Sequence, residues 1–328
     1  MLERTSGPMQ ELKETNYALG DRARLLRILD EQGYWFFRGV LDPEALETVR
    51  QHFMAELHSR DLVKQGSDDA VWNLTTPITI DDGVTSSRYP RMRDARVWET
   101  FVEHPEIVRF FSALAGETPE WLTTSDYYRI VPPGQDAGED PFELRHQDGL
   151  GLPGLDFATC WIPLADVDPD VGGLAIVPGS HKGGIDRNRW FTPEHMSSDQ
   201  WARADYAVGD VLMFPSAILH SGLRNRSIDK FRMSLDIRLY MRGSSRPAVG
   251  PVTAITADEV VIDAGGDAPI SLKLTDETMI LLLSGDNEIP RMHTRQQVAD
   301  VLPLGKQVMA VGKEGKALIL RPAHSAGY

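Results

Sequence analysis

The sequence predicts a mainly β protein with flanking helices, in which the helices come first. Helix signals dominate up to about residue 115, and from Trp121 onward short runs of β-branched and aromatic residues appear between Gly/Pro turns. Several short strands at close spacing are typical of an antiparallel barrel or sandwich. At about 150 residues per domain, a chain of 328 residues is long enough for about two domains.

The N-terminal elements follow from helix signals. Residues 21–30 place Leu, Ile and Ala between charged residues, as in an amphipathic helix, and Gly33 ends it. Asp42 followed by Pro43 combines an N-cap with a proline at the first helical position. The expected elements are helices over 21–30, 42–58 and 97–115, a buried strand over 34–37, and a mostly irregular segment over 66–93.

The second half of the chain is expected to be rich in strands. Strands are predicted over 121–131, 142–146, 157–164, 174–177, 211–214 and 232–240. Residues 178–206 form a long connection without a clear period, and such loops are usually functional lids or disordered. Further strands are predicted over 259–262, 270–274, 279–283 and 316–320, with one helix over 294–302.

Composition narrows the class of protein. The 34 basic and 48 acidic side chains give a net charge of −14, which opposes binding to nucleic acid or anionic lipid, since both need a basic surface. The single cysteine, Cys160, excludes an internal disulfide and a zinc site built from several thiolates. Residues 279–283 are the longest aliphatic run, far short of the about 20 residues that span a bilayer. We therefore expect a cytoplasmic protein that binds neither nucleic acid nor membrane.

Two histidines and an aspartate form the candidate metal site. His146 and Asp148 are two residues apart after an expected strand, so both side chains point the same way. Two histidines and one carboxylate can occupy one face of an octahedral Fe(II) ion and leave positions for a chelating cosubstrate and oxygen. This spacing alone is weak evidence for a metal site. His104 and Glu106 have the same spacing, and the start of a helix explains the presence of both residues. His220 ends an apolar strand, where it is either a ligand or a hydrogen-bonded core residue.

Arg232 strengthens this hypothesis. It begins the strand after the polar turn at 223–230, and a hairpin of that length returns it to the cavity that His220 faces. A buried arginine needs an anion, and a carboxylate is its best bidentate partner. Two histidines, an aspartate and an arginine at one cavity are much less probable by chance than any one of them.

Four sequence blocks resemble a known family. The blocks are HQD, CWIPLADVDPDVGGLAIVPGSHK, VGDVLMFPSAILHSG and FRMSLDIRLY, in that order between residues 121 and 241. They resemble the phytanoyl-CoA dioxygenase family of Fe(II)- and 2-oxoglutarate-dependent oxygenases, and residues 33–41 resemble its N-terminal strand. The resemblance implies a double-stranded β-helix, the cupin-like jelly roll, with flanking helices. We therefore expect a jelly-roll oxygenase domain over 1–245, with its core at 121–242, and a β-rich extension over 246–328.

The resemblance also implies residue roles and chemistry. His146, Asp148 and His220 would bind Fe(II), and Arg232 would hold the distal carboxylate of 2-oxoglutarate. Other residues implied to line the cosubstrate pocket are Gln147, Trp161 and Tyr127. The implied reaction consumes 2-oxoglutarate and O2, releases succinate and CO2, and hydroxylates a C–H bond of a small organic metabolite.

Two positions refine what the resemblance implies. Related halogenases replace the carboxylate ligand by a small residue, so Asp148 favours hydroxylation, desaturation or cyclisation over halogenation. Many relatives carry a lysine just before the Pro-Pro-Gly turn, whereas this chain has Val131 there and Arg129 two residues earlier.

Two weaker signals each have a second interpretation. Arg88 and Arg91 belong to a group of four arginines that either bind an anionic group of the substrate or pair with surface acids. Trp190 and Phe191 lie in the long connection, where they either close over a substrate or pack the loop onto the barrel.

Two other functions stay open on the sequence alone. One is a jelly-roll module that binds or assembles without turnover, and the other is a metal-dependent isomerase or lyase that does without 2-oxoglutarate. The extension at 246–328 could pack on the barrel, shape the pocket or build a homo-oligomer.

Overall fold

The chain divides into two units in the computed structural model, which describes residues 8–78, 89–122, 127–134, 140–186, 198–241, 243–282 and 291–323. The first unit holds residues 1–122, 126–150 and 157–241, and the second holds 123–125, 151–156 and 242–328. Each unit has a hydrophobic core of its own.

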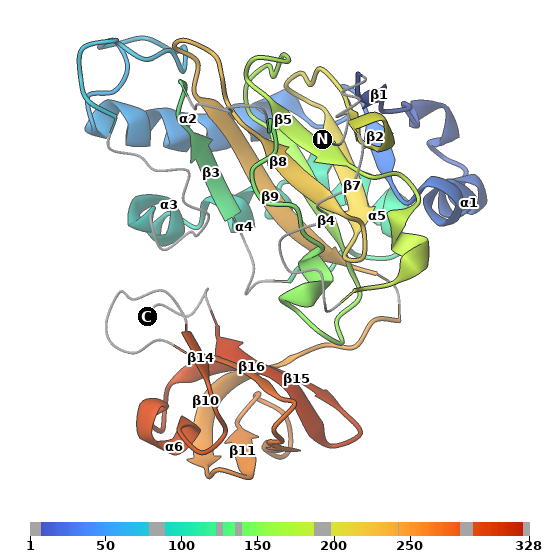
Figure 1. The fold of residues 1–328 in the computed structure, drawn as a ribbon, viewed down its shortest axis with the longest axis vertical. Helices are drawn as coiled ribbons and strands as arrows, with labels where there is room; N and C mark the ends of the chain where they lie inside the picture. The colour runs from blue at the N-terminus through green and yellow to red at the C-terminus, as the bar shows by residue number, and fades with distance from the viewer. Residues whose placement is uncertain are drawn as a thin grey trace, which may run out of the picture. The chain divides into compact units, whose positions relative to one another are not determined.

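Two sheets form the first unit (Figure 1). The five-stranded sheet has the order β2 (Trp35–Phe37), β7 (Val211–Pro215), β4 (Phe157–Pro163), β9 (Arg232–Tyr240) and β3 (Tyr127–Val131). The four-stranded sheet has the order β1 (Gln10–Glu11), β6 (Ala202–Arg203), β5 (Gly173–Ile176) and β8 (His220–Leu223). Side chains of both sheets share one buried cluster, with Phe36, Trp161 and Phe214 from the first sheet and Ile176 and Ala202 from the second. The predicted jelly roll with flanking helices is confirmed.

Helices pack on the outer face of the five-stranded sheet. They are α1 (Arg22–Gln32), α2 (Pro43–Ser59), α3 (Pro90–Asp94), α4 (Val97–Glu103) and α5 (Pro105–Ala115). Phe53, Phe101 and Phe111 from these helices share a buried core with Met233 and Ile237 of β9. The first unit therefore has two hydrophobic cores. One lies between the helices and the five-stranded sheet, and the other lies between the two sheets.

The helix boundaries follow the signals in the sequence, with one exception. Gly33 adopts a left-handed conformation with φ 81° and ends α1, and the Asp42 carboxylate accepts hydrogen bonds from the first turn of α2. The single helix predicted over 97–115 is instead two helices. His104 is extended between them, because it precedes Pro105, and a residue before proline disfavours the helical region.

Alternation along β9 determines what faces the inside of the jelly roll. Its odd-numbered residues from Met233 to Leu239 are apolar and pack in the core beneath the helices. Its even-numbered residues from Arg232 to Arg238 are polar or charged and nearly buried: Arg232, Ser234, Asp236 and Arg238. Successive side chains of a strand point to opposite faces. One strand therefore supplies apolar packing outside and a row of polar and charged groups inside.

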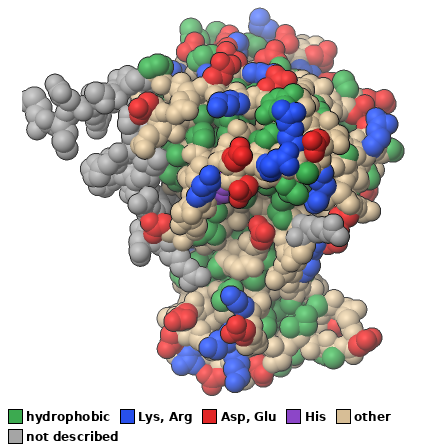
Figure 2. All heavy atoms as spheres, turned by 90° about the vertical axis from the view of Figure 1, so that its right-hand side faces the viewer, with side chains coloured by type: hydrophobic (Ala, Val, Ile, Leu, Met, Phe, Trp, Pro, Cys, Tyr) green, Lys and Arg blue, Asp and Glu red, His purple; other side chains and the backbone are tan. Residues whose placement is uncertain are grey.

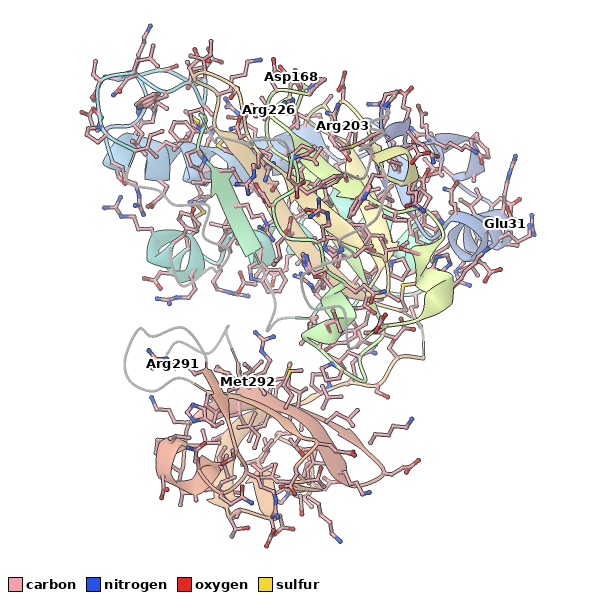
Figure 3. All side chains as sticks on the ribbon, viewed as in Figure 1. Glu31, Asp168, Arg203, Arg226, Arg291 and Met292 are labelled. Carbon is pink, nitrogen blue, oxygen red and sulfur yellow. The ribbon has the colours of Figure 1, made fainter. Side chains whose placement is uncertain are left out.

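The turn before β9 is fixed by backbone hydrogen bonds. Arg226 N–H and Ser227 N–H both donate to the Asp170 carbonyl, at 2.7 and 3.0 Å. Figure 3 shows Asp168 and Arg226 at the same end of the first unit. This anchoring fixes where β9 begins and so where Arg232 enters the interior.

The second unit is built on one seven-stranded sheet. Its order is β12 (Ile270–Lys273), β11 (Glu259–Ile262), β10 (Ala248–Ile255), β15 (Gln307–Lys313), β16 (Lys316–Pro322), β13 (Met279–Leu282) and β14 (Arg291–His293). Helix α6 (Val298–Val301) contributes Val298 to the core of this sheet, beside Val260, Ile280, Val308 and Leu320. Strands β10, β14 and β15 were not predicted from the sequence.

Charge is dispersed on the face shown in Figure 2. Acidic and basic side chains interleave over the described part of that face, although the net charge is −14. Within the described residues, no helix has the length and apolar character that crossing a membrane requires.

Candidate metal centre

The two candidate histidines are held side by side by the backbone. His146 N–H donates to the His220 carbonyl and His220 N–H to the His146 carbonyl, both at 2.9 Å, which makes an antiparallel bridge. Directly opposed residues present their side chains on the same face. The imidazole centroids are accordingly 4.2 Å apart.

Backbone carbonyls determine which imidazole nitrogens are available. Nδ1 of His146 lies 3.1 Å from the Leu144 carbonyl, and Nδ1 of His220 lies 3.1 Å from the Ile218 carbonyl. A carbonyl only accepts, so each Nδ1 is placed to donate to it, and each Nε2 is directed to Asp148 Oδ1. Burial and the neighbouring His146 lower the pKa of His220 to about 3, which keeps its imidazole neutral.

Asp148 completes the set at the start of a 3-10 turn, Asp148–Leu150. Its Oδ1 lies 3.4 Å from His146 Nε2 and 3.7 Å from His220 Nε2. Its Oδ2 accepts hydrogen bonds from Thr159 Oγ1 at 2.6 Å and Arg238 Nη2 at 3.1 Å. Burial alone would raise the pKa of Asp148, but the Arg238 guanidinium is the largest opposing influence, and the pKa lies well below its usual range. The side chain is therefore a carboxylate with one oxygen directed to the histidines.

These three groups have the donors and spacing that one divalent ion requires. Their ligand atoms all lie within 4.8 Å of one another. Neighbouring ligands of an octahedral ion with bonds of about 2.1 Å are about 3 Å apart, close to the separations found here. Two imidazoles and one carboxylate are the donor set of non-haem Fe(II) oxygenases.

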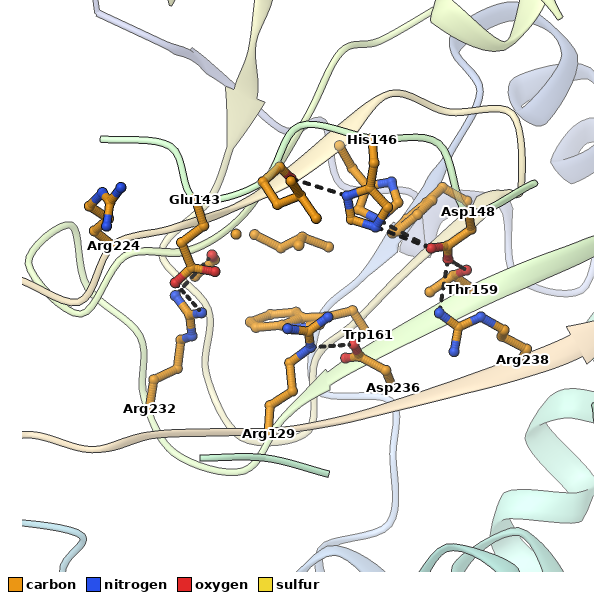
Figure 4. Close-up of a pocket in the computed structure, with 16 residues that line it drawn as sticks. Arg129, Glu143, His146, Asp148, Thr159, Trp161, Arg224, Arg232, Asp236 and Arg238 are labelled. Carbon is orange, nitrogen blue, oxygen red and sulfur yellow. Dashed lines mark hydrogen bonds and ion pairs between the residues drawn. The ribbon is translucent and has the colours of Figure 1, made fainter. Parts of the chain in front are cut away.

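The site opens into a cavity of about 450 Å³ within the first unit (Figure 4). This volume suits a small-molecule site. Besides the three candidate ligands, its described lining includes Arg129, Glu143, Thr159, Trp161, Gly222, Arg224, Arg232, Asp236 and Arg238. The cavity is therefore strongly charged, and most of its cations come from β9 and the strands beside it.

Three of these arginines are paired with an acid. Arg129 Nε lies 2.8 Å from Asp236 Oδ2, and Arg238 pairs with Asp148 as described above. Arg232 Nη2 lies 3.2 Å from Glu143 Oε1, and the Arg232 side chain is only 3% exposed. Burial lowers the pKa of Arg232, and Glu143 opposes this shift, so the guanidinium keeps its charge.

The structure brings together part of the predicted site. His146, Asp148, His220, Arg232 and Trp161 all line the cavity. Gln147 is not among its described lining residues. Its side-chain amide donates to the Gly184 and Ala217 carbonyls and accepts from Asp186 N–H, which ties the loop at 184–186 to the turn before β8.

The remaining predicted residues lie elsewhere or outside the described chain. Arg91 is exposed on α3 and is not among the described residues that line the cavity. The backbone of Tyr127 pairs with Asp236, but its side chain lies outside the description. Arg88, Trp190 and Phe191 also lie outside the described residues.

Sequence reasoning missed Glu143, Thr159, Asp236 and Arg238. The signal for two of them was available, because alternate residues from Arg232 to Arg238 are polar within an otherwise apolar strand. Thr159 could have been found only from the register, in which it lies opposite Arg238 on the neighbouring strand.

Comparison with known proteins identifies the family of this chain. A sequence model of the phytanoyl-CoA dioxygenase (PhyH) family matches residues 29–234. The 1-deoxypentalenic acid 11-beta-hydroxylases of Streptomyces arenae and Streptomyces exfoliatus are each 30% identical over 253 residues, covering 70% of this chain and 84% of the relative. The solved structure of EvdO2 from Micromonospora carbonacea var. aurantiaca with 2-oxoglutarate is 15% identical, covers 72% of this chain and 96% of its own, and has a TM-score of 0.47. The extent of the family match shows that the chain belongs to the phytanoyl-CoA dioxygenase family.

Proposed function

We propose that this protein is an Fe(II)- and 2-oxoglutarate-dependent hydroxylase that inserts oxygen into a C–H bond of a small organic metabolite. The observation that carries the proposal is the cluster of His146, Asp148 and His220, whose ligand atoms lie within 4.8 Å of one another at a charged cavity. The names of the two curated relatives describe hydroxylation at one position of 1-deoxypentalenic acid. This supports hydroxylation as the reaction, while the substrate of this chain stays a small molecule of unspecified structure.

The chain's own groups have separate tasks in this proposal. His146, Asp148 and His220 would hold Fe(II) at the cavity. Bound Fe(II) with 2-oxoglutarate and O2 supplies the oxidising power, and succinate and CO2 are released. Arg232 would bind the distal carboxylate of 2-oxoglutarate, and Trp161 lies between Arg232 and the candidate metal ligands (Figure 4).

Succinate formation tests this proposal directly. The full chain, loaded with Fe(II) under nitrogen and then given 2-oxoglutarate and air, should form succinate and take up oxygen even without substrate. His146→Ala, Asp148→Ala or His220→Ala should each abolish this turnover and the binding of Mn(II). His52→Ala on α2 is the matched control, because His52 is not among the described residues that line the cavity.

The same assay separates the other two functions. A binding module would retain no iron and form no succinate. An isomerase or lyase would turn over without 2-oxoglutarate and tolerate Arg232→Ala. A screen of metabolites for a mass gain of one oxygen would then identify the substrate and the reaction together.

Two further expectations are part of the proposal. We place the protein in the cytoplasm, in line with a single cysteine that is buried in the core. We also propose that residues 246–328 mediate self-association, in line with the exposure of Met292 and Leu304, which are 62% and 63% exposed. Light scattering that finds a monomer at micromolar concentration would refute the second expectation.

A further inference from the structure

A carboxylate of the chain itself lies against Arg232. Glu143 Oε1 accepts a hydrogen bond from Arg232 Nη2 at 3.2 Å. Arg232 Nη1 donates to the Gly173 and Leu223 carbonyls, and within the described chain Nε has no hydrogen-bond partner. The guanidinium is thus anchored on one side by backbone and neutralised on another by Glu143.

Backbone pairing holds Glu143 in this position. Glu143 N–H donates to the Gly222 carbonyl at 2.8 Å, and Phe142 forms a bridge with Leu223. Glu143 therefore lies opposite Gly222, and its carboxylate occupies the space above that glycine. A Cβ built at position 222 would collide with Glu143 Oε2. The absence of a side chain at Gly222 is what makes room for the carboxylate.

One buried guanidinium cannot neutralise two carboxylates. The Arg232 side chain is 3% exposed and that of Glu143 is 16% exposed, so charges here are weakly screened by water. A second carboxylate at Arg232 would lie close to that of Glu143 and repel it. Binding of a dicarboxylate at Arg232 therefore requires Glu143 to leave.

A second arginine that can pair with the displaced carboxylate lies on the same face. Arg224 N–H donates to the Pro141 carbonyl at 2.9 Å, so Arg224 is a diagonal neighbour of Glu143, within reach of a long side chain. Arg224 lines the cavity, and its Nε is buried without a hydrogen-bond partner in the described chain. Figure 4 shows Glu143 between Arg224 and the histidines.

We propose that Glu143 is a specificity-determining residue that competes with 2-oxoglutarate for Arg232. The distal carboxylate of the cosubstrate displaces Glu143, which then pairs with Arg224. This inference rests on the proposed function, because it takes Arg232 as the cosubstrate's anchor. The exchange lowers the affinity for 2-oxo acids with a second carboxylate, since only these must displace Glu143 from Arg232, and so Glu143 sets how strongly 2-oxoglutarate is preferred over 2-oxo acids that lack this group.

Calorimetric titration of the Mn(II)-loaded full chain under nitrogen tests the exchange. Glu143→Gln keeps the shape of the side chain and removes its charge, so the Kd for 2-oxoglutarate should fall at least about tenfold. The Kd for 2-oxobutyrate, which lacks the distal carboxylate, should change less than about twofold. Asp140→Asn is the matched control, because it removes an exposed charge, paired with Arg145, from the same segment. It should leave both affinities within about twofold.

Two further variants keep the test decisive. Gly222→Ala should drive the Glu143 carboxylate from Arg232 and also tighten 2-oxoglutarate binding, without a change in charge. In an Arg232→Gln background, Glu143→Gln should give no gain. A folded Glu143→Gln protein that binds 2-oxoglutarate no more tightly than the wild type, while the wild type binds it and forms succinate, overturns this inference alone. A wild type that neither binds 2-oxoglutarate nor forms succinate overturns the proposed function as well.

Discussion

The ion pair between Arg238 and Asp148 offers a quantitative test of how the metal centre is built. The two side chains are 4% and 8% exposed, and Arg238 Nη2 lies 3.1 Å from Asp148 Oδ2. Arg238→Met keeps much of the side-chain volume and removes the charge. The substitution leaves a buried carboxylate without its main cation. Removing one partner of a buried ion pair lowers the free energy of unfolding by about 3–5 kcal/mol. We therefore expect the free energy of unfolding of the metal-free protein to fall by about that amount at pH 7.

The pH dependence follows from the pKa of Asp148. Burial raises this pKa, but the Arg238 guanidinium is the largest influence that opposes burial, and the pKa lies well below the usual value. A carboxylate with a lowered pKa stabilises the folded state above its unfolded pKa of about 3.9 and loses that contribution as pH falls through the folded pKa. In Arg238→Met the guanidinium no longer opposes the effect of burial, so the pKa of Asp148 in the folded state rises. The stability difference between the two proteins should therefore be largest near neutral pH and shrink as the solution is acidified.

Urea denaturation followed by tryptophan fluorescence, in the presence of a chelator, measures this difference. Arg93→Gln is the control, because its pair with Asp94 is 31% and 72% exposed and is worth about 0–1 kcal/mol. Saturating Zn(II) should recover part of the loss, since a bound cation neutralises Asp148 in place of Arg238. Asp148→Asn in the same background should also recover part of it. A loss below about 1 kcal/mol at pH 7 for Arg238→Met would refute this account of the site.

Three other predictions concern the same unit. Thr159→Val removes the hydrogen bond of 2.6 Å to Asp148 Oδ2 and should weaken metal binding about 10–100-fold in a competition titration with a chelator. Gly33→Ala should lower the free energy of unfolding by about 1–3 kcal/mol in urea, because Gly33 has φ 81° and a Cβ there would collide with His181. Phe53→Ala should cost about 3–5 kcal/mol in the same measurement, since Phe53 is fully buried between α2 and the sheet, and a loss below 1 kcal/mol would contradict that packing.

The three residues of the candidate metal site could be found from the sequence because each lies in a recognisable local motif. His146 and Asp148 are two residues apart, and His220 ends a strand whose apolar run is visible in the sequence. The pairing of these two segments was not predictable from local pattern. Residues 142–146 were expected to form a regular strand, but the described structure has only isolated bridges to β8, at Phe142 and His146. Such pairing depends on long-range contacts, which hydrophobic periodicity does not report.

The other differences between the predicted and the observed elements occur where signals in the sequence conflict. Strand β10 contains Gly250 and Pro251, which are turn residues by composition, yet both pair within the sheet of the second unit. Pro251 is tolerated because proline lacks an N–H to donate but can still accept through its carbonyl, as it does from Asp263 N–H at 3.0 Å. The helix over 97–115 was predicted as one element because both halves are apolar on one face, and Pro105 divides it.

The charges of the described cavity lining suggest a role for Arg224, the one arginine of that lining that is not in one of its three ion pairs. The described lining contains four arginines and three acids, and three ion pairs join Arg129 to Asp236, Arg232 to Glu143 and Arg238 to Asp148. Arg224 is the fourth cation. If Glu143 stayed at Arg232, a dicarboxylate entering the cavity would add a charge for which only Arg224 is available, on the side of Glu143 away from the histidines (Figure 4). If Glu143 moves to Arg224, every arginine has one carboxylate partner, and the distal group of 2-oxoglutarate has a buried, pre-anchored guanidinium. Arg224→Gln should therefore weaken 2-oxoglutarate binding in the wild type but have little effect in Glu143→Gln, whereas equal losses in both backgrounds would show that Arg224 binds the cosubstrate itself.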